Sequence, residues 1–141
     1  MRIVLIICAL VLWFGVEDSH AQKRVGGKML KGYDVIYPFK NGRAKVIKNG
    51  KMGFIDMNGD EIIKPEFDNI MPFEKGVARV EKGLLLGLIN EAGEILLDPI
   101  YESITAQKDN LFMTSRKGKR GLVKITGTSP ENVEYIVDIR D

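Results

Sequence analysis

Short stretches of alternating hydrophobic and polar residues, separated by glycine-containing turns, make up most of the chain. Residues 43–48 and 51–56 are two such stretches on either side of Asn49-Gly50, a pair that favours the two-residue turn of a β-hairpin. Directly opposed residues of a hairpin share a face. The predicted hairpin therefore has one small, apolar face, made of Ala44, Val46, Gly53 and Ile55.

The hairpin recurs at an interval of 34 residues, without gaps. The aligned positions include the aromatic residues Tyr33, Phe67 and Tyr101 and the mid-strand glycines Gly53, Gly87 and Gly121. The equivalent apolar faces are Ala78, Val80, Gly87 and Ile89, and then Phe112, Thr114, Gly121 and Val123. This repetition predicts an all-β fold of tandem antiparallel β-hairpins in three units, at residues 33–66, 67–100 and 101–127, with about three strands each.

Three details of the repeat lead to further expectations. Pro65 and Pro99 are expected to end the last strand of the first and second units, because proline cannot donate to a strand ladder. Glycine weakens a strand, so the repeated mid-strand glycine indicates close approach of a neighbouring backbone or ring. The turn at Lys117-Gly118 fits a two-residue hairpin less well than Asn-Gly, which leaves a bulge as an alternative.

The two ends of the array differ from its middle. Residues 22–32 are basic and contain glycine, and they predict a flexible lead-in. Residues 128–141 include an alternating segment that predicts a final capping strand over the open edge of the last unit.

The first 21 residues have the pattern of a secretory signal peptide. Met1-Arg2 is positive, residues 3–16 are apolar, and a short polar segment ends at Ala21. As a helix these 14 apolar residues would rise about 21 Å, short of the roughly 30 Å hydrocarbon core. We therefore expect a signal-peptide helix over residues 1–21, cleaved before Gln22, and an exported bacterial protein that is periplasmic, surface-bound or secreted. Membrane contact would come only from an uncleaved signal, and a retained anchor is the alternative.

Cleavage would remove Cys8, Trp13 and His20, the only residues of their types. The mature chain would then have no disulfide, no imidazole and no thiol, so its stability would depend on packing. It would keep 20 basic and 17 acidic residues, an excess too mild to indicate nucleic acid. The sequence contains no phosphate-binding glycine loop and no metal-ligand spacing. We therefore expect no cofactor, no metal, no nucleic-acid partner and no enzymatic activity.

The unit over residues 33–66 resembles the WG repeat, a β-rich bacterial repeat. The shared features are an aromatic–acidic pair, Pro-Phe, a Gly-x-Ala-x-Val strand, a hairpin and a strand ending in proline. The Lys-Trp-Gly-[Phe/Tyr]-Ile-Asp segment of the family corresponds to residues 51–56, 85–90 and 119–124 here. All three copies lack the tryptophan, whose place is taken by Met52, Leu86 and Arg120. The resemblance implies an array of β-hairpins, no common catalytic activity and use as a binding or interaction module.

Two groups of residues are candidates for binding. The second unit carries Leu84, Leu85, Leu86 and Leu88 where the other units are more polar, and these leucines either form an exposed patch for a partner or pack against a neighbouring unit. The third hairpin carries a basic cluster of Arg116, Lys117, Lys119 and Arg120, which either binds an anionic surface or prevents edge-to-edge strand pairing.

Three repeated features have a structural and a functional interpretation. The carboxylates Asp34, Asp68 and Glu102 bind cations or a basic partner, or hydrogen-bond within turns. Residues 56–61 resemble half of a calcium loop, although a solvated hairpin turn is favoured. The aromatic residues at the repeated position either stack on sugars or form the core between units, and the core interpretation is favoured. These residues are Tyr33, Phe67 and Tyr101.

From these features we expect an exported, non-enzymatic interaction module that engages a protein or an envelope polymer through exposed hairpin faces. The alternative is a structural or accessory envelope protein without a discrete ligand site.

Overall fold

The computed structural model describes residues 24–25 and 28–140 of the chain. The predicted signal peptide at residues 1–21 and its cleavage site lie outside the described residues, so both stay predictions. The part that is described is all-β apart from one turn of 3₁₀ helix, η1 (Pro130–Asn132). The predicted all-β array of antiparallel hairpins is confirmed.

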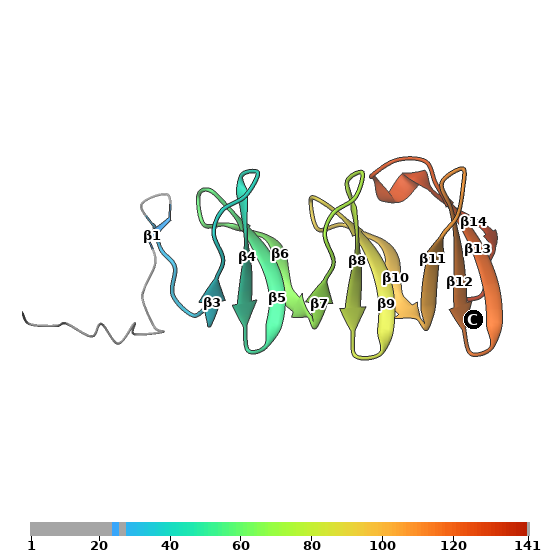
Figure 1. The fold of residues 1–141 in the computed structure, drawn as a ribbon, viewed down its shortest axis with the longest axis horizontal. Helices are drawn as coiled ribbons and strands as arrows, with labels where there is room; N and C mark the ends of the chain where they lie inside the picture. The colour runs from blue at the N-terminus through green and yellow to red at the C-terminus, as the bar shows by residue number, and fades with distance from the viewer. Residues whose placement is uncertain (1–23, 26–27, 141) are drawn as a thin grey trace, which may run out of the picture.

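Three four-stranded antiparallel sheets follow one another in a row, one for each repeat unit (Figure 1). The first sheet consists of β3 (Val35–Ile36), β4 (Arg43–Lys48), β5 (Lys51–Asp56) and β6 (Glu61–Phe67). The second consists of β7 (Asn69–Ile70), β8 (Val77–Lys82), β9 (Leu85–Asn90) and β10 (Ile95–Tyr101). The third consists of β11 (Ser103–Ala106), β12 (Leu111–Arg116), β13 (Lys119–Ile125) and β14 (Val133–Val137).

Each sheet begins with a short strand that the sequence pattern did not reveal. The strands β3 and β7 have two residues each, too few for an alternation of polar and apolar residues to be recognised. In the third sheet the fourth strand is β14, which pairs antiparallel with β13, for example Val123 with Tyr135. The predicted C-terminal strand on the last unit is therefore confirmed.

The predicted hairpin register is confirmed in all three units. Val46 pairs with Gly53, Val80 with Gly87, and Thr114 with Gly121. The paired faces are buried, with Val46 and Val80 at 0% exposure and Thr114 at 2%. The third hairpin has a regular register up to its tip, where Arg116 pairs with Lys119, so the bulge considered at Lys117-Gly118 is absent.

The mid-strand glycines are explained by a close approach of the next strand. A Cβ atom at Gly87 would lie 2.6 Å from the carbonyl oxygen of Leu97 and 2.9 Å from the nitrogen of Pro99. The backbone around Pro65 comes equally close to Gly53. Register shifts in the β5–β6 and β9–β10 ladders show that the later strands bulge at these prolines.

The expectation that Pro65 and Pro99 end their strands is therefore wrong. Both β6 and β10 continue for two residues past the proline, to Phe67 and Tyr101. A bulge locally interrupts the ladder, so a residue without an N–H group is tolerated there.

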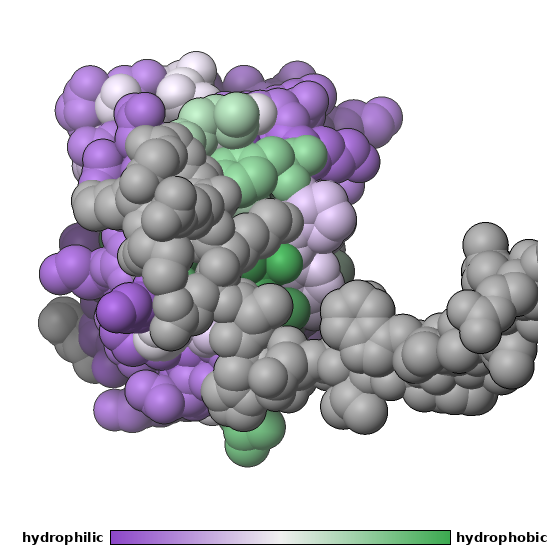
Figure 2. All heavy atoms as spheres, turned by 90° about the vertical axis from the view of Figure 1, so that its left-hand side faces the viewer, coloured by the Kyte–Doolittle hydropathy of each residue, from purple (hydrophilic) through white to green (hydrophobic). Residues whose placement is uncertain are grey.

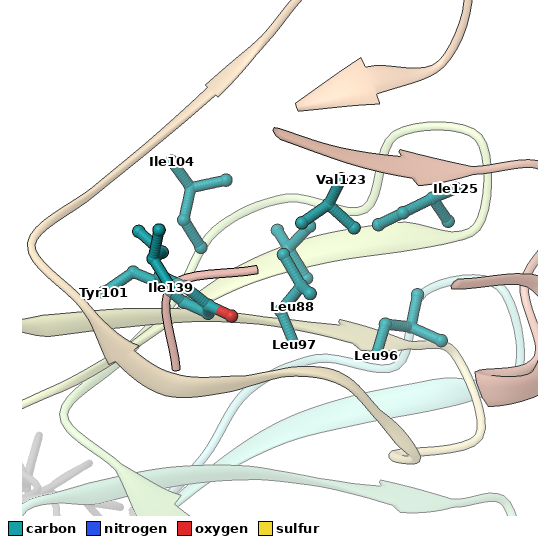
Figure 3. Packing of buried hydrophobic residues seen from close by; sticks show 8 residues of the cluster. All are labelled: Leu88, Leu96, Leu97, Tyr101, Ile104, Val123, Ile125 and Ile139. Carbon is teal, nitrogen blue, oxygen red and sulfur yellow. The ribbon is translucent and has the colours of Figure 1, made fainter. Parts of the chain in front are cut away.

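The three sheets stack on one another, so the core lies between sheets rather than within a unit. Between the first and second sheets, the central residues are Ile63, Phe67, Ile70, Ala78, Val80 and Ile89, with Met52 and Phe54 packed against them. Between the second and third sheets, they are Leu88, Leu96, Leu97, Tyr101, Ile104, Val123, Ile125 and Ile139 (Figure 3). Each small apolar face is thus covered by the larger side chains of the preceding sheet.

The stack is closed differently at its two ends. At the N-terminal end, the pair β1 (Arg24–Val25) and β2 (Lys28–Met29) precedes Leu30, which is 7% exposed and packs against Val46 and Ile55. Figure 2 shows apolar atoms in the middle of this end face and hydrophilic residues around it. Flexibility of the lead-in over residues 22–32 stays a prediction, but its described part includes this buried leucine.

At the C-terminal end, the outer face of the third sheet mixes polar and apolar side chains. Arg120 stands where Met52 and Leu86 stand in the earlier units. On the same face Met113 and Val137 are 38% and 47% exposed.

Replacing Thr114 by valine is expected to raise the free energy of unfolding by about 1 kcal/mol, as measured by urea denaturation. The Thr114 hydroxyl is buried and has no hydrogen-bond partner among the described residues. Valine occupies the equivalent positions 46 and 80. Val80→Thr is the matched control and should lower the free energy of unfolding. Changes of opposite sign in the two variants would support this account. A loss of stability in Thr114→Val would contradict it.

Candidate binding surface at the hairpin tips

The tips of the β4–β5, β8–β9 and β12–β13 hairpins lie in a row along one side of the stack (Figure 1). We call this row, with the residues that flank each turn, the hairpin-tip edge. Its turns are Asn49-Gly50, Gly83-Leu84 and Lys117-Gly118. Asn49 and Gly50 both have positive φ, as do Lys117 and Gly118, whereas only glycine does in the second turn. The middle tip can therefore present a leucine side chain.

A carboxylate from the start of each unit holds each tip in place. The turn N–H groups donate to these carboxylates, Asn49 to Asp34 at 2.6 Å, Gly83 to Asp68 at 2.7 Å and Lys117 to Glu102 at 3.0 Å. The hydrogen-bonding interpretation of this repeated acidic position is thus confirmed. The spacing of 34 residues reflects the same turn support in every unit.

Ion pairs neutralise Lys51 and Lys82 at the first two tips, whereas Lys48 has only a cation–π contact, its Nζ lying 5.9 Å from the centroid of the Tyr33 ring. Lys51 Nζ lies 2.5 Å from Asp68 Oδ1, which links the first unit to the second, and Lys82 Nζ lies 3.6 Å from Glu66 Oε2. The hydrogen bond from Lys51, together with that from the Gly83 N–H, lowers the pKa of the Asp68 carboxyl group below its usual value. Of the lysines described at these two tips Lys48 alone lacks an ion pair, so the two tips offer less free positive charge than the third.

The third tip keeps its positive charge. The side chains of Lys117, Lys119 and Arg120 are exposed, and that of Arg116 is half-buried. Within the described part of the chain none of the four forms an ion pair. The structure thus brings the predicted basic cluster together at one end of the hairpin-tip edge.

The four leucines of the second unit do not form one patch. Leu84 is 95% exposed at the tip and Leu85 is 37% exposed, whereas Leu88 is 4% exposed. Leu86 and Leu88 belong to the core between the second and third sheets. The exposed-patch hypothesis is therefore wrong for Leu86 and Leu88, because alternate residues of β9 face the third sheet, and only Leu84 and Leu85 remain available to a partner.

The geometry of the β5–β6 turn favours a hydrogen-bonded turn over a calcium loop. Asp56 Oδ1 accepts the backbone N–H groups of Asn58 at 2.8 Å and Asp60 at 2.9 Å. The bond from Asp60 is the largest cause that lowers the pKa of the Asp56 carboxyl group. Asn90 forms the same turn in the second unit. No cluster of three potential metal ligands occurs among the described residues.

The repeated aromatic residues belong to the core. Phe67 is 2% and Tyr101 1% exposed, and each packs between two sheets. Tyr33, partly buried, packs at the N-terminal end and donates a hydrogen bond to Glu61 at 2.9 Å; burial, followed by this bond, raises the pKa of Tyr33 to about 12. The core interpretation is confirmed, and no exposed aromatic groove remains for sugar stacking at these positions.

Sequence reasoning missed a cavity between the second and third sheets, of about 560 Å³. It opens near Ala106-Gln107, where the first two units have Pro-Phe. Loss of that large pair in the third copy was a visible signal of lost packing volume. Over the described residues, no helix is both long and apolar enough to cross a membrane.

A comparison with family models matches the WG containing repeat three times, at residues 31–51, 52–83 and 87–119. No curated protein and no solved structure matches the chain. The WG repeat family is not a known enzyme family. The matched segments are offset from the sheets, since the second segment begins within the first sheet, and together they cover more than half of the sequence. The chain therefore belongs to the WG repeat family.

Proposed function

We propose that this protein is an exported, non-enzymatic interaction module that binds an acidic protein surface through the hairpin-tip edge of its second and third units. The observation that carries the proposal is a leucine, Leu84, that is 95% exposed in the same row as four cations without ion-pair partners. An apolar side chain beside unpaired positive charges suits a partner with an apolar site rimmed by carboxylates.

The architecture supports this use of the edge. Carboxylates hold the turns at 2.6–3.0 Å, so little conformational entropy would be lost when a partner orders the edge. The sides of neighbouring sheets that face each other are buried, whereas the tips project from the array. Export is proposed from the pattern of residues 1–21 and would place the partner in the cell envelope or outside it.

The proposal predicts that a variant with Leu84→Ser, Lys117→Glu and Lys119→Glu loses its partner. The tagged full-length chain is expressed in a bacterial host, and proteins recovered from envelope extract are identified by mass spectrometry. We expect recovery of the specific partner to fall by about tenfold or more, since central apolar and charged contacts dominate binding energy. Binding of the identified partner is then measured with purified proteins.

The matched control is Lys40→Glu with Lys108→Glu, two exposed lysines in turns at the opposite ends of the strands. Equal recovery by the tip variant and this control would refute the proposed edge. The extract is also treated either with a protease or with a protease-free enzyme that degrades anionic polysaccharide. Binding that is lost after the second treatment but not after the first would identify an envelope polymer as the partner instead. A purified protein that still begins at Met1 would contradict export by cleavage before Gln22.

A further inference from the structure

The two junctions between sheets are closed by different side chains. At the junction of the first and second sheets, the Phe73 ring meets Phe54 edge-on, with ring centroids 5.9 Å apart and an interplanar angle of 69°. The Arg43 guanidinium lies 5.4 Å from the centroid of the same Phe73 ring. Phe73 belongs to the repeated Pro-Phe pair, so the pair of the second unit helps to seal this junction.

At the junction of the second and third sheets these three side chains have no equivalents. The positions 34 residues later carry Leu88 for Phe54, Gln107 for Phe73 and Val77 for Arg43. Both partners of the aromatic pair and the cation above it are therefore missing. The core below is still packed by Leu97, Tyr101 and Val123, which are at most 1% exposed, so the loss is confined to one side of the junction.

A cavity of about 560 Å³, open to solvent on one side, lies at this place, and its volume is within the range of small-molecule sites in proteins. Its apolar lining includes Leu88, Ile104, Phe112 and Ile125, which come from both sheets. Phe112 stands where the earlier units have alanine, and its half-buried side chain lines the cavity. The cavity therefore offers a ring-sized apolar space beside an aromatic side chain.

One wall of the cavity is held by contacts outside the repeat pattern. Residues 126–128 form this wall, and the buried side chain of Asn90 donates a hydrogen bond of 2.6 Å from Nδ2 to the carbonyl oxygen of Thr128. A Cβ atom at Gly76 would lie 2.8 Å from Thr128 Cγ2, so the wall is in close contact with the second unit. The cavity is thus a built feature of the junction.

Arg79 supplies an unused donor to this cavity. Its side chain lines the cavity, and its Nε–H group is buried without a hydrogen-bond partner among the described residues. Arg79 forms no ion pair there, although Glu74 and Lys75 also line the cavity. The Arg79 side chain as a whole is half-buried, but its Nε–H group is buried without a partner, and a carboxylate can satisfy that group with a charge-assisted bond.

We propose that this cavity binds a small arylalkyl carboxylate. The aromatic ring occupies the space that a phenylalanine ring fills at the first junction and packs against Leu88 and Phe112. The carboxylate accepts hydrogen bonds from the Arg79 guanidinium. This site is separate from the hairpin-tip edge and does not depend on the function proposed for it.

The test is an amide NMR titration of the full chain with 3-phenylpropionate, which has the ring and the carboxylate. We expect saturable shifts at residues that line the cavity, with a Kd of about 1 mM or lower for a ligand of this size. The uncharged 3-phenylpropanamide should bind about tenfold more weakly, because it cannot pair with a cation. Absence of saturable shifts, or equal binding of acid and amide, would overturn the proposal.

Two variants separate the ring site from the charge site. Gln107→Phe restores the repeat residue and should abolish binding while thermal unfolding shows an intact fold. Arg79→Met should weaken the carboxylate about tenfold but leave the amide unchanged, a difference that a merely structural role of Arg79 would not produce. Lys45→Met, at the equivalent position of the first unit, is the control and should not change either affinity.

If Gln107→Phe does not fold, Ala106→Leu fills the same cavity with a smaller side chain and serves in its place. Binding that survives in a folded, cavity-filled variant would show that the ligand lies elsewhere, and would overturn the assignment.

Discussion

The Gly87→Ala variant is expected to lose about 3 kcal/mol of its free energy of unfolding, measured by urea denaturation. The new Cβ would meet the Leu97 carbonyl oxygen at 2.6 Å and the Pro99 nitrogen at 2.9 Å. Both are backbone atoms of the adjacent strand β10, which is itself packed against the third sheet. The clash therefore cannot be relieved by rotation of a side chain, and the strands must separate.

Gly83→Ala is the control for this prediction. Gly83 has φ +62° at the hairpin tip, and a Cβ there meets nothing within 4 Å. Its substitution introduces only left-handed backbone strain, which costs about 1 kcal/mol. A loss as large in Gly83→Ala as in Gly87→Ala would show that backbone conformation, rather than close strand approach, explains the repeated mid-strand glycine.

Leu97→Ala should also have a large effect, a loss of about 3 kcal/mol. Leu97 is completely buried at 0% exposure and lies with Leu88 and Val123 between the second and third sheets (Figure 3). Since each sheet of such an array contacts only its neighbours, the loss should fall mainly on the docking of the third sheet. Hydrogen exchange is expected to show lost amide protection in β12 and β13 before β4 and β5.

Ile95→Ala is the matched control because it lies on the same strand and is 41% exposed. It should change stability by less than about 1 kcal/mol. Equal losses for the two variants, or uniform loss of protection over all three sheets, would contradict the view that stacking of neighbouring sheets stabilises the array.

The hairpins themselves were predictable from local sequence. The glycine in each turn limits the loop to two residues, and this loop length sets the register of the pairs that follow. Because side chains alternate along a strand, the register then decided that Val46 and Val80 share a face with Gly53 and Gly87. The repetition supplied three independent examples of one pattern.

The errors concern features that depend on a neighbouring strand or sheet. A bulge allows β6 and β10 to continue past Pro65 and Pro99, and no local signal distinguishes that proline from one that ends a strand. Similarly, the leucine-rich strand was ambiguous because its two faces meet different surroundings. Only the stacking of sheets assigns Leu88 to the core and leaves Leu84 in solvent.

The candidate sites also combine features visible in the local sequence with features that depend on neighbouring units. The basic residues of the third hairpin were visible as a charge cluster, but their lack of ion pairs depends on which acidic residues lie nearby in space. The cavity beside Arg79 arises because two sheets meet without the phenylalanine that seals the first junction.

The sequence by itself determined the all-β class, the three units, the hairpin register and the small apolar faces, since all of these follow from turn residues and a period of two. Only the tertiary structure decided what covers each face, which leucines are exposed and where a cavity remains. Those properties depend on side chains from different units that meet across a sheet-to-sheet junction, and residue order along one strand does not specify that meeting.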